Sequence, residues 1–253
     1  MATLSSVSNK CKGKSGALII ILCLAVVSNV SAIAKIFEPM SANTIPLAKA
    51  QSTPNVFPID SKPYGKPYGD WSIIWWQSIL SIPIDKNPLK DNTGKDCSQG
   101  KSGPIWFLAG TGGGAVKRTC TIPAGKAVMF PVFNGECSYA EFPQYKSESD
   151  LRKCAKDQLD KVTNVDASVD GAKIPDLQKY RAQSPLFDVV LPSNNVFGAP
   201  PGPTKSVADG FWLILTPLSI GNHNIHFAGS AVDITSSGVT NFATDVSYDL
   251  TIK

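Results

Sequence analysis

The sequence is poor in the residue patterns that carry most enzyme chemistry. It has two histidines among 253 residues, and no Cys-x-x-Cys pair of the kind that holds zinc. It also lacks the Gly-x-Ser-x-Gly turn of many serine hydrolases. The run Gly110–Ala115 matches a dinucleotide-binding loop only superficially, because no helix pattern follows it, and we predict a loop within a hairpin. These gaps lead us to expect no cofactor and no metal site.

The two histidines, His223 and His226, lie three residues apart in a stretch typical of a strand. Positions three apart on a strand face opposite sides of the sheet, so one metal ion does not easily reach both. We expect His223 on the inner face, with Ile225 and Phe227, and His226 on the outer face. Both are predicted to be structural.

Acidic residues are absent before Glu38, where the sequence reads as an export signal. Three lysines precede an unbroken apolar run at 17–27, and Ala32-Ile33-Ala34 matches the cleavage pattern of signal peptidase. We predict a signal peptide over residues 1–34, cleaved after Ala34. The apolar run is too short to cross a bilayer, so we expect membrane contact only if the leader stays uncleaved.

The chain without its leader also carries little net charge. Removing the leader takes away three lysines and no acids, so the formal charge falls from +4 to about +1. No basic stripe stands out along the sequence, and we expect no nucleic-acid partner. The predicted partner is an extracellular or cell-surface ligand that the sequence does not identify.

The cysteine count is even outside the leader. Cys11 and Cys23 fall within residues 1–34, which leaves four cysteines. An even count in an exported chain favours two disulfides, although four cysteines allow three connectivities. We expect the two pairs that are local in the chain, Cys97 with Cys120 and Cys137 with Cys154.

The periodicity predicts a mainly β domain. Residues 35–69 read as a Pro/Ser-rich spacer, and residues 70–253 as one domain. A tryptophan-rich helix is expected over 71–80, capped by Asp70, and its three tryptophans are predicted to lie in the core. A second helix is expected over 147–162, with a capping box at Ser147. Several short apolar or alternating runs between turn signals predict strands, with the clearest alternation over 245–252. Residues 192–205 are rich in proline and glycine and are predicted as a loop. The predicted fold is a β-sandwich, with a jelly roll as one form, carrying two added helices.

Candidate catalytic residues are few. Glu136 and Glu141 form a carboxylate pair near a predicted disulfide. Glycosidases use two carboxylates as their catalytic groups, so this pair is a candidate. Asp209 and His226 are weaker candidates. Asn134 and Gly135 read as a turn that closes the strand before them. We therefore interpret the glutamates as residues of a polar loop, where most carboxylates are simply solvated.

As a whole, the chain resembles an uncharacterised group of secreted bacterial and archaeal proteins. The stretches that carry the resemblance are the tryptophan helix at 71–76, Gly103–Gly110, Ile122–Lys126, Glu136–Ser138, and Asp209–Trp212 with Pro217–Ser219. The resemblance implies export and a shared fold, and it implies no activity.

Two functions of different classes follow from these observations. The favoured hypothesis is an exported, non-catalytic binding or structural protein of the extracellular space or cell surface. The alternative is a secreted hydrolase that acts on a glycan or similar polymer through a carboxylate pair, Glu136 with Glu141 or Asp209.

Overall fold

The fold is described here for residues 54–235 and 238–253 of a computed structural model. The predicted signal peptide and its cleavage site lie outside these residues. Among the residues described, no helix is long and apolar enough to cross a membrane.

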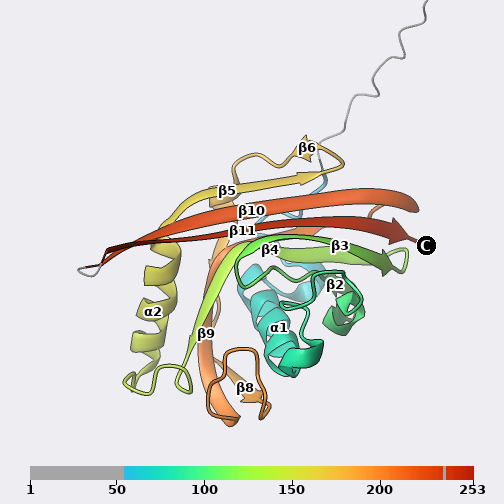
Figure 1. The fold of residues 1–253 in the computed structure, drawn as a ribbon. Helices are drawn as coiled ribbons and strands as arrows, with labels where there is room; N and C mark the ends of the chain where they lie inside the picture. The colour runs from blue at the N-terminus through green and yellow to red at the C-terminus, as the bar shows by residue number, and fades with distance from the viewer. Residues whose placement is uncertain (1–53, 236–237) are drawn as a thin grey trace, which may run out of the picture. The chain divides into compact units, whose positions relative to one another are not determined.

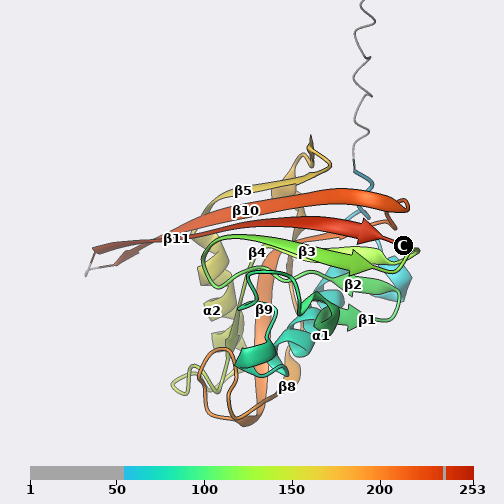
Figure 2. The same cartoon turned by 45° about the vertical axis from the view of Figure 1, so that its right-hand side comes forward.

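The described chain folds into two sheets and two α-helices (Figure 1). Sheet A has the strand order β1-β2-β4-β9-β7, with β8 also paired to β9, and sheet B has the order β3-β11-β10-β5-β6. Most neighbours are antiparallel, whereas β2–β4 and β3–β11 are parallel. The order β5, β10, β11, β3 can be followed across sheet B in Figure 2. The elements are α1 (Tyr68–Leu80), α2 (Glu148–Asp160), β1 (Lys101–Ser102), β2 (Ile105–Phe107), β3 (Gly114–Ile122), β4 (Ala127–Ser138), β5 (Val162–Val169), β6 (Ala172–Lys173), β7 (Arg181–Gln183), β8 (Phe187–Leu191), β9 (Gly202–Leu215), β10 (Gly221–Thr235) and β11 (Gly238–Ile252), with short 3-10 helices at Pro63–Gly65, Ile84–Lys86, Cys97–Gly100 and Leu177–Tyr180.

The predicted β-sandwich is confirmed, and its core lies between the sheets. Phe130 of β4 stacks on Phe227 of β10, with ring centroids 4.8 Å apart. Figure 1 shows the long strands of sheet B crossing β4 and β9 at a steep angle, so the lower halves of β4 and β9 extend beyond sheet B. Helix α2 covers that extension on the same face of sheet A, since Gly135 and Cys137 share their side of β4 with Phe133, whose ring reaches Gly229 of sheet B.

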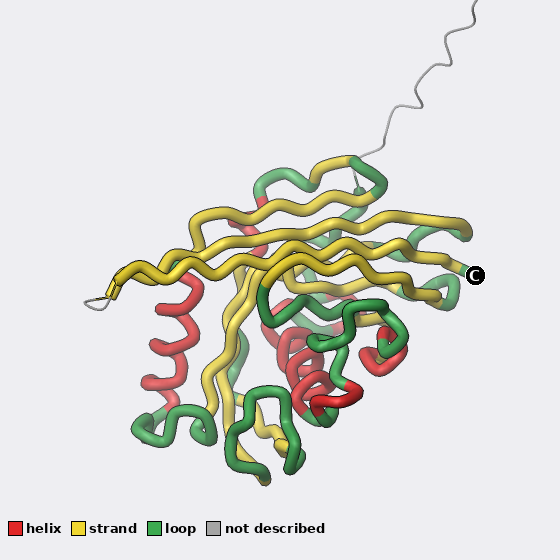
Figure 3. The backbone as a smooth tube through the Cα atoms, viewed as in Figure 1, coloured by secondary structure: helices red, strands yellow, loops and turns green. Residues whose placement is uncertain are grey.

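Helix α1 covers the opposite face of sheet A. Trp71, Trp75 and Trp76 are all buried, which confirms their prediction as core residues. The Trp75 indole donates from Nε1 to the Leu108 carbonyl (3.1 Å), and its ring centroid lies 5.4 Å from that of Trp212. The helix begins three residues earlier than predicted, after Pro67, so Asp70 lies in the first turn instead of capping it. Figure 3 shows the two helices on either side of the long strands of sheet A.

Helix α2 has the predicted start. Ser147 is the N-cap, and it exchanges hydrogen bonds with Asp150 in a capping box. Both predicted disulfides are also confirmed: Cys97–Cys120 and Cys137–Cys154 have Cα–Cα distances of 6.0 and 6.2 Å. The second ties α2 to β4.

Three predictions of local structure were wrong. The glycine run does not turn a hairpin, because β2 before it belongs to sheet A and β3 after it to sheet B. Residues 202–205, predicted as loop, begin β9, where Pro203 fits because β8 pairs along only one edge of this end of the strand. Strand β4 continues through Gly135 to Ser138, so Glu136 lies on a strand and not in a polar loop.

The domain also starts earlier than residue 70. Val56 pairs with Leu215, and Phe57 N–H donates to the Ile214 carbonyl (2.9 Å). The Tyr68 hydroxyl donates to the Phe57 carbonyl (2.7 Å). The described part of the predicted spacer, residues 54–69, is therefore packed on the domain.

Candidate functional site

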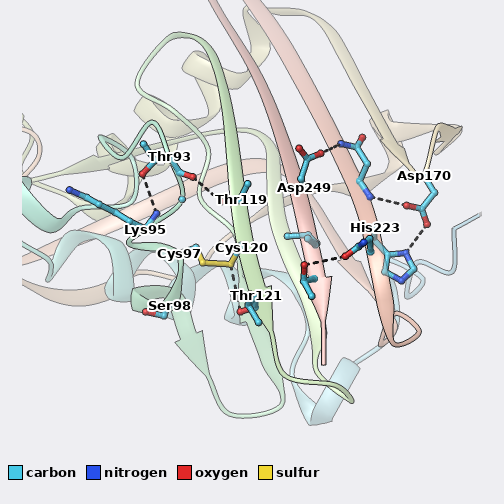
Figure 4. Close-up of a pocket in the computed structure, with 15 residues that line it drawn as sticks. Thr93, Lys95, Cys97, Ser98, Thr119, Cys120, Thr121, Asp170, His223 and Asp249 are labelled. Atoms are coloured by element: carbon cyan, nitrogen blue, oxygen red, sulfur yellow. Dashed lines mark hydrogen bonds and ion pairs between the residues drawn. A yellow bond between two sulfur atoms is a disulfide. The ribbon is translucent and has the colours of Figure 1, made fainter.

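A broad groove of about 960 Å³ lies on the outer face of sheet B. Figure 4 shows the loop with Thr93 and Cys97 on one side of it and His223 with Asp170 on the other. Strands β3, β11 and β10 form its floor. The floor side chains are hydroxyls, amides and a carboxylate, namely Thr119, Thr121, Asn222, Asn224, Asp249 and Thr251.

Strand alternation produces this polar floor. On β3, exposed Thr119 and Thr121 alternate with buried Arg118, Cys120 and Ile122. The register then aligns the outward residues in rows. Thr119 lies opposite Asp249 on β11, which lies opposite Asn224 on β10. The side chains in one row are close enough to contact one another.

The loop that walls the groove is fixed in several ways. Its Cys97 is bonded to Cys120, and Thr119 N–H donates to the Thr93 carbonyl (2.9 Å). Gly94 has φ +91°, and a Cβ there would lie 2.0 Å from the Thr119 carbonyl oxygen, so only glycine fits. Burial of Asp91 alone would raise its pKa, but hydrogen bonds from the loop outweigh this and lower the pKa of Asp91.

Arg118 supports the groove from beneath. Its guanidinium is 1% exposed and donates to the carbonyls of Asp91, Ala109 and Gly110 and to the Tyr248 hydroxyl, at 2.6–2.9 Å. No carboxylate bond to Arg118 is found among the described residues. Through Nε and Nη1 this buried cation holds the loop, the glycine run and β11 together by bonds to neutral acceptors, while Nη2 is buried without a partner among the described residues.

The floor carries one ion pair. Lys117 Nζ lies 2.9 Å from Asp249 Oδ2, and the Asn224 amide donates to Asp249 Oδ1 (3.0 Å). Lys117 first, and then Asn224, lower the pKa of Asp249 below its usual value. The carboxylate is therefore charged at neutral pH and faces solvent, where it can accept hydrogen bonds from a ligand.

At the rim of the groove, three side chains form a connected array. His223 Nδ1 lies 2.7 Å from Asp170 Oδ2, a contact that Figure 4 marks with a dashed line. His223 Nε2 lies 3.2 Å from Ser219 Oγ and 2.9 Å from the Ser219 carbonyl oxygen. Sequence reasoning missed Ser219 and Asp170. The spacing in the chain gave no sign of them, because the pairing of β5 with β10 is what brings Asp170 beside His223.

The structure brings Glu136 and Glu141 together, but in a buried place. Glu136 is 5% exposed, on the face of sheet A opposite α2. Ser138 and Ser206 are cross-strand partners; Ser206 donates to Glu136, and Ser138 donates to Glu141 (2.6 Å). Burial first, and then the adjoining Glu141 carboxyl, raise the pKa of Glu136 well above its usual value.

This geometry does not favour a glycosidase pair. Glycosidase carboxyls are roughly 5 to 9.5 Å apart and open to substrate. The two glutamates are within hydrogen-bonding reach of each other, and Oε1 of Glu136 is buried without a partner among the described residues.

Asp209 and His226 lie apart from this pair. Asp209 is 3% exposed and pairs with Arg181 (2.8 Å), which also binds Asp160 of α2. His226 lies on the outer face of sheet B, opposite Ser247 and 3.1 Å from Asp245, whereas His223 lies opposite buried Leu250. The two histidines thus face opposite sides, as predicted, and no cluster suited to a metal ion is found in the described residues.

Comparison with known proteins identifies no relative of this chain. No family model matches the chain, and neither a curated protein nor a solved structure matches it significantly. The resemblance to a group of secreted proteins stays a prediction.

Proposed function

We propose that this protein is an exported β-sandwich that binds a hydroxyl-rich ligand, such as a glycan chain, in the groove on sheet B. The observation that carries the proposal is the floor itself. Pockets for drug-like molecules are mostly apolar, with few polar groups. This floor instead offers hydroxyls, amides and a charged carboxylate in adjacent rows. A sugar has donors and acceptors on all sides and suits such a surface.

Location outside the cytoplasm is supported by the two disulfides, which persist in oxidising compartments. The predicted leader supports it independently. One disulfide stands in the wall of the groove, so an oxidising environment would also preserve the shape of the site.

Binding is tested with purified protein and a panel of neutral, acidic and amino-sugar polysaccharides, by isothermal titration calorimetry and pull-down. We expect at least one polysaccharide to bind. Asp249→Asn and Asn224→Ala should then weaken its Kd at least about tenfold, as expected for losing one hydrogen bond to a charged group.

Asp188→Asn is the matched control. Asp188 is also an exposed strand carboxylate paired with a lysine, Lys205 at 2.7 Å, but it lies on β8 of sheet A. We expect this variant to bind like the wild type. Absence of binding to every polysaccharide, or equal loss in the floor variants and the control, would reject the proposal.

A further inference from the structure

The array at the rim of the groove has the parts of a hydrolytic triad. Ser219 Oγ can donate to His223 Nε2 across 3.2 Å, and His223 Nδ1 can donate to Asp170 across 2.7 Å. A nucleophile within reach of a base, and a carboxylate that fixes the base, are what define a triad, whatever the fold or chain order. Here the chain order is Asp, Ser, His.

The backbone holds Asp170 firmly in its position. Asp170 and Gly171 form the turn between β5 and β6, with φ of 51° and 78°. Asp170 N–H donates to the Asn224 carbonyl (2.7 Å), and Asn224 N–H donates to Asp170 Oδ1 (2.8 Å). The other carboxylate oxygen, Oδ2, is thereby aimed at His223. A non-glycine residue at positive φ costs energy, and such strain concentrates at functional sites.

Ser219 is the accessible member. It lies in the exposed turn between β9 and β10, before Ile220, which is 77% exposed. The His223 side chain is 12% exposed, and both His223 and Asp170 line the groove. An ester at this rim could reach the Ser219 hydroxyl from solvent.

The contacts of Nε2 depend on the protons of His223. The Ser219 carbonyl only accepts, so it binds Nε2 when the imidazole carries both protons. When Asp170 holds the single proton of a neutral imidazole on Nδ1, Nε2 has a lone pair and accepts from the Ser219 hydroxyl instead. The neutral form is the one that can act as a general base.

We propose that Ser219 and His223 hydrolyse acyl esters, with Asp170 positioning the imidazole. Ser219 Oγ passes its proton to Nε2 and bonds to the acyl carbon. The ester C–O bond breaks, and the alcohol leaves with that proton. Water then gives a proton to Nε2 while its oxygen bonds to the acyl carbon, and Ser219 regains its proton as the acid departs.

This activity goes beyond ligand binding in the groove and departs from the non-catalytic hypothesis based on sequence. A small ester needs no contact with the groove floor. The two proposals can therefore fail separately: a protein that binds no polysaccharide could still hydrolyse a small ester, and a protein without esterase activity could still bind a polysaccharide in the groove.

The first test uses the wild-type protein. We expect a fluorophosphonate probe to label it once, and peptide mapping to place the label on Ser219. We also expect hydrolysis of p-nitrophenyl acetate above the buffer rate. Labelling of another residue, or no label at all, would overturn the proposal.

Variants give the second test. Ser219→Ala should lower kcat/KM by about 10²- to 10⁴-fold. Ser193, an exposed serine in the loop between β8 and β9, is the control, and Ser193→Ala should keep the full rate. Asp170→Asn should lower kcat with little change in KM, as expected for a positioning residue. A Ser219→Ala variant as active as the wild type would reject the proposal. Thermal unfolding checks each variant, and if His223→Asn does not fold, Ser219→Ala and the label still decide.

Discussion

Carboxylates occur on both sheets, and their surroundings differ in two respects. On sheet B, Asp249 is 46% exposed in its side chain and has Lys117 at 2.9 Å, which lowers its pKa. On sheet A, Glu136 is 5% exposed and has a second carboxyl, Glu141, as its neighbour, which raises its pKa. Water and a cation favour the charged form of the first group, while burial and a like group favour the protonated form of the second. The first arrangement suits recognition at a surface, and the second suits the inside of a fold.

The largest expected effect comes from removing the cation under the groove. Arg118→Met should lower the free energy of unfolding by roughly 3–5 kcal/mol, because four oxygen acceptors, most of them buried, lose a charged donor. Chemical denaturation of the purified variant measures the loss. A loss below about 1 kcal/mol would mean that water replaces the guanidinium, and that the groove does not depend on Arg118.

The two disulfides allow the regions to be compared directly. They close loops of similar length, with sequence separations of 23 and 17, so removing either should cost about 3 kcal/mol. The two disulfides should differ in their effect on ligand binding. Cys97→Ser/Cys120→Ser should weaken binding in the groove, and Cys137→Ser/Cys154→Ser should not, at a temperature where both variants are folded. Equal weakening by both pairs would show that the groove depends on global stability and not on its own wall.

The buried carboxyl pair predicts a pH dependence of stability. Because the pKa of Glu136 is raised, the folded state keeps a proton there at pH values where an ordinary, solvated glutamate of the unfolded chain has lost it. The folded state then binds more protons, so the free energy of unfolding falls as pH rises, by up to about 1.4 kcal/mol per pH unit for one proton. Glu136→Gln, which resembles the protonated acid, should flatten this decline in urea melts above about pH 5. A variant as steep as the wild type would contradict a protonated Glu136.

The smallest effect is expected at the surface ion pair. Lys117→Ala should change the free energy of unfolding by about 0.2–1 kcal/mol, since exposed pairs are screened by water and salt. Lys205→Ala, which removes the partner of Asp188, is the matched control in sheet A. Both differences should shrink in 1 M NaCl. A salt-independent loss larger than about 2 kcal/mol at Lys117 alone would mean that Asp249 is structural and not poised for a ligand.

The sequence predicted features that depend on neighbours in the chain. The capping box at Ser147, the alternation of β11 and both local disulfides belong to this group. Each needs only a pattern of a few residues or a short loop. The tryptophan helix was also correct as core, because its apolar residues leave no polar face.

The missed features depend on pairing between distant strands. Glu136 was placed in a loop because Asn134 and Gly135 read as a turn, yet β9 pairs with β4 through this point. Gly135 lies where α2 approaches, since a Cβ there would lie 2.2 Å from the end of the Gln158 side chain. The rim array was missed because Asp170 and His223 meet only through the pairing of β5 with β10. The spacing of residues within a motif cannot predict contacts between distant strands.

The parallel pair of β3 and β11 affects how the domain reaches its native state. Strand β11 follows every other described strand in the chain, yet it lies inside sheet B, between β3 and β10. Until it arrives, β3 has no partner strand and β10 has one open edge, and open edges invite aggregation. Contacts between segments so far apart in the chain also slow folding. The second sheet is therefore completed only when the last of the described strands has been synthesised.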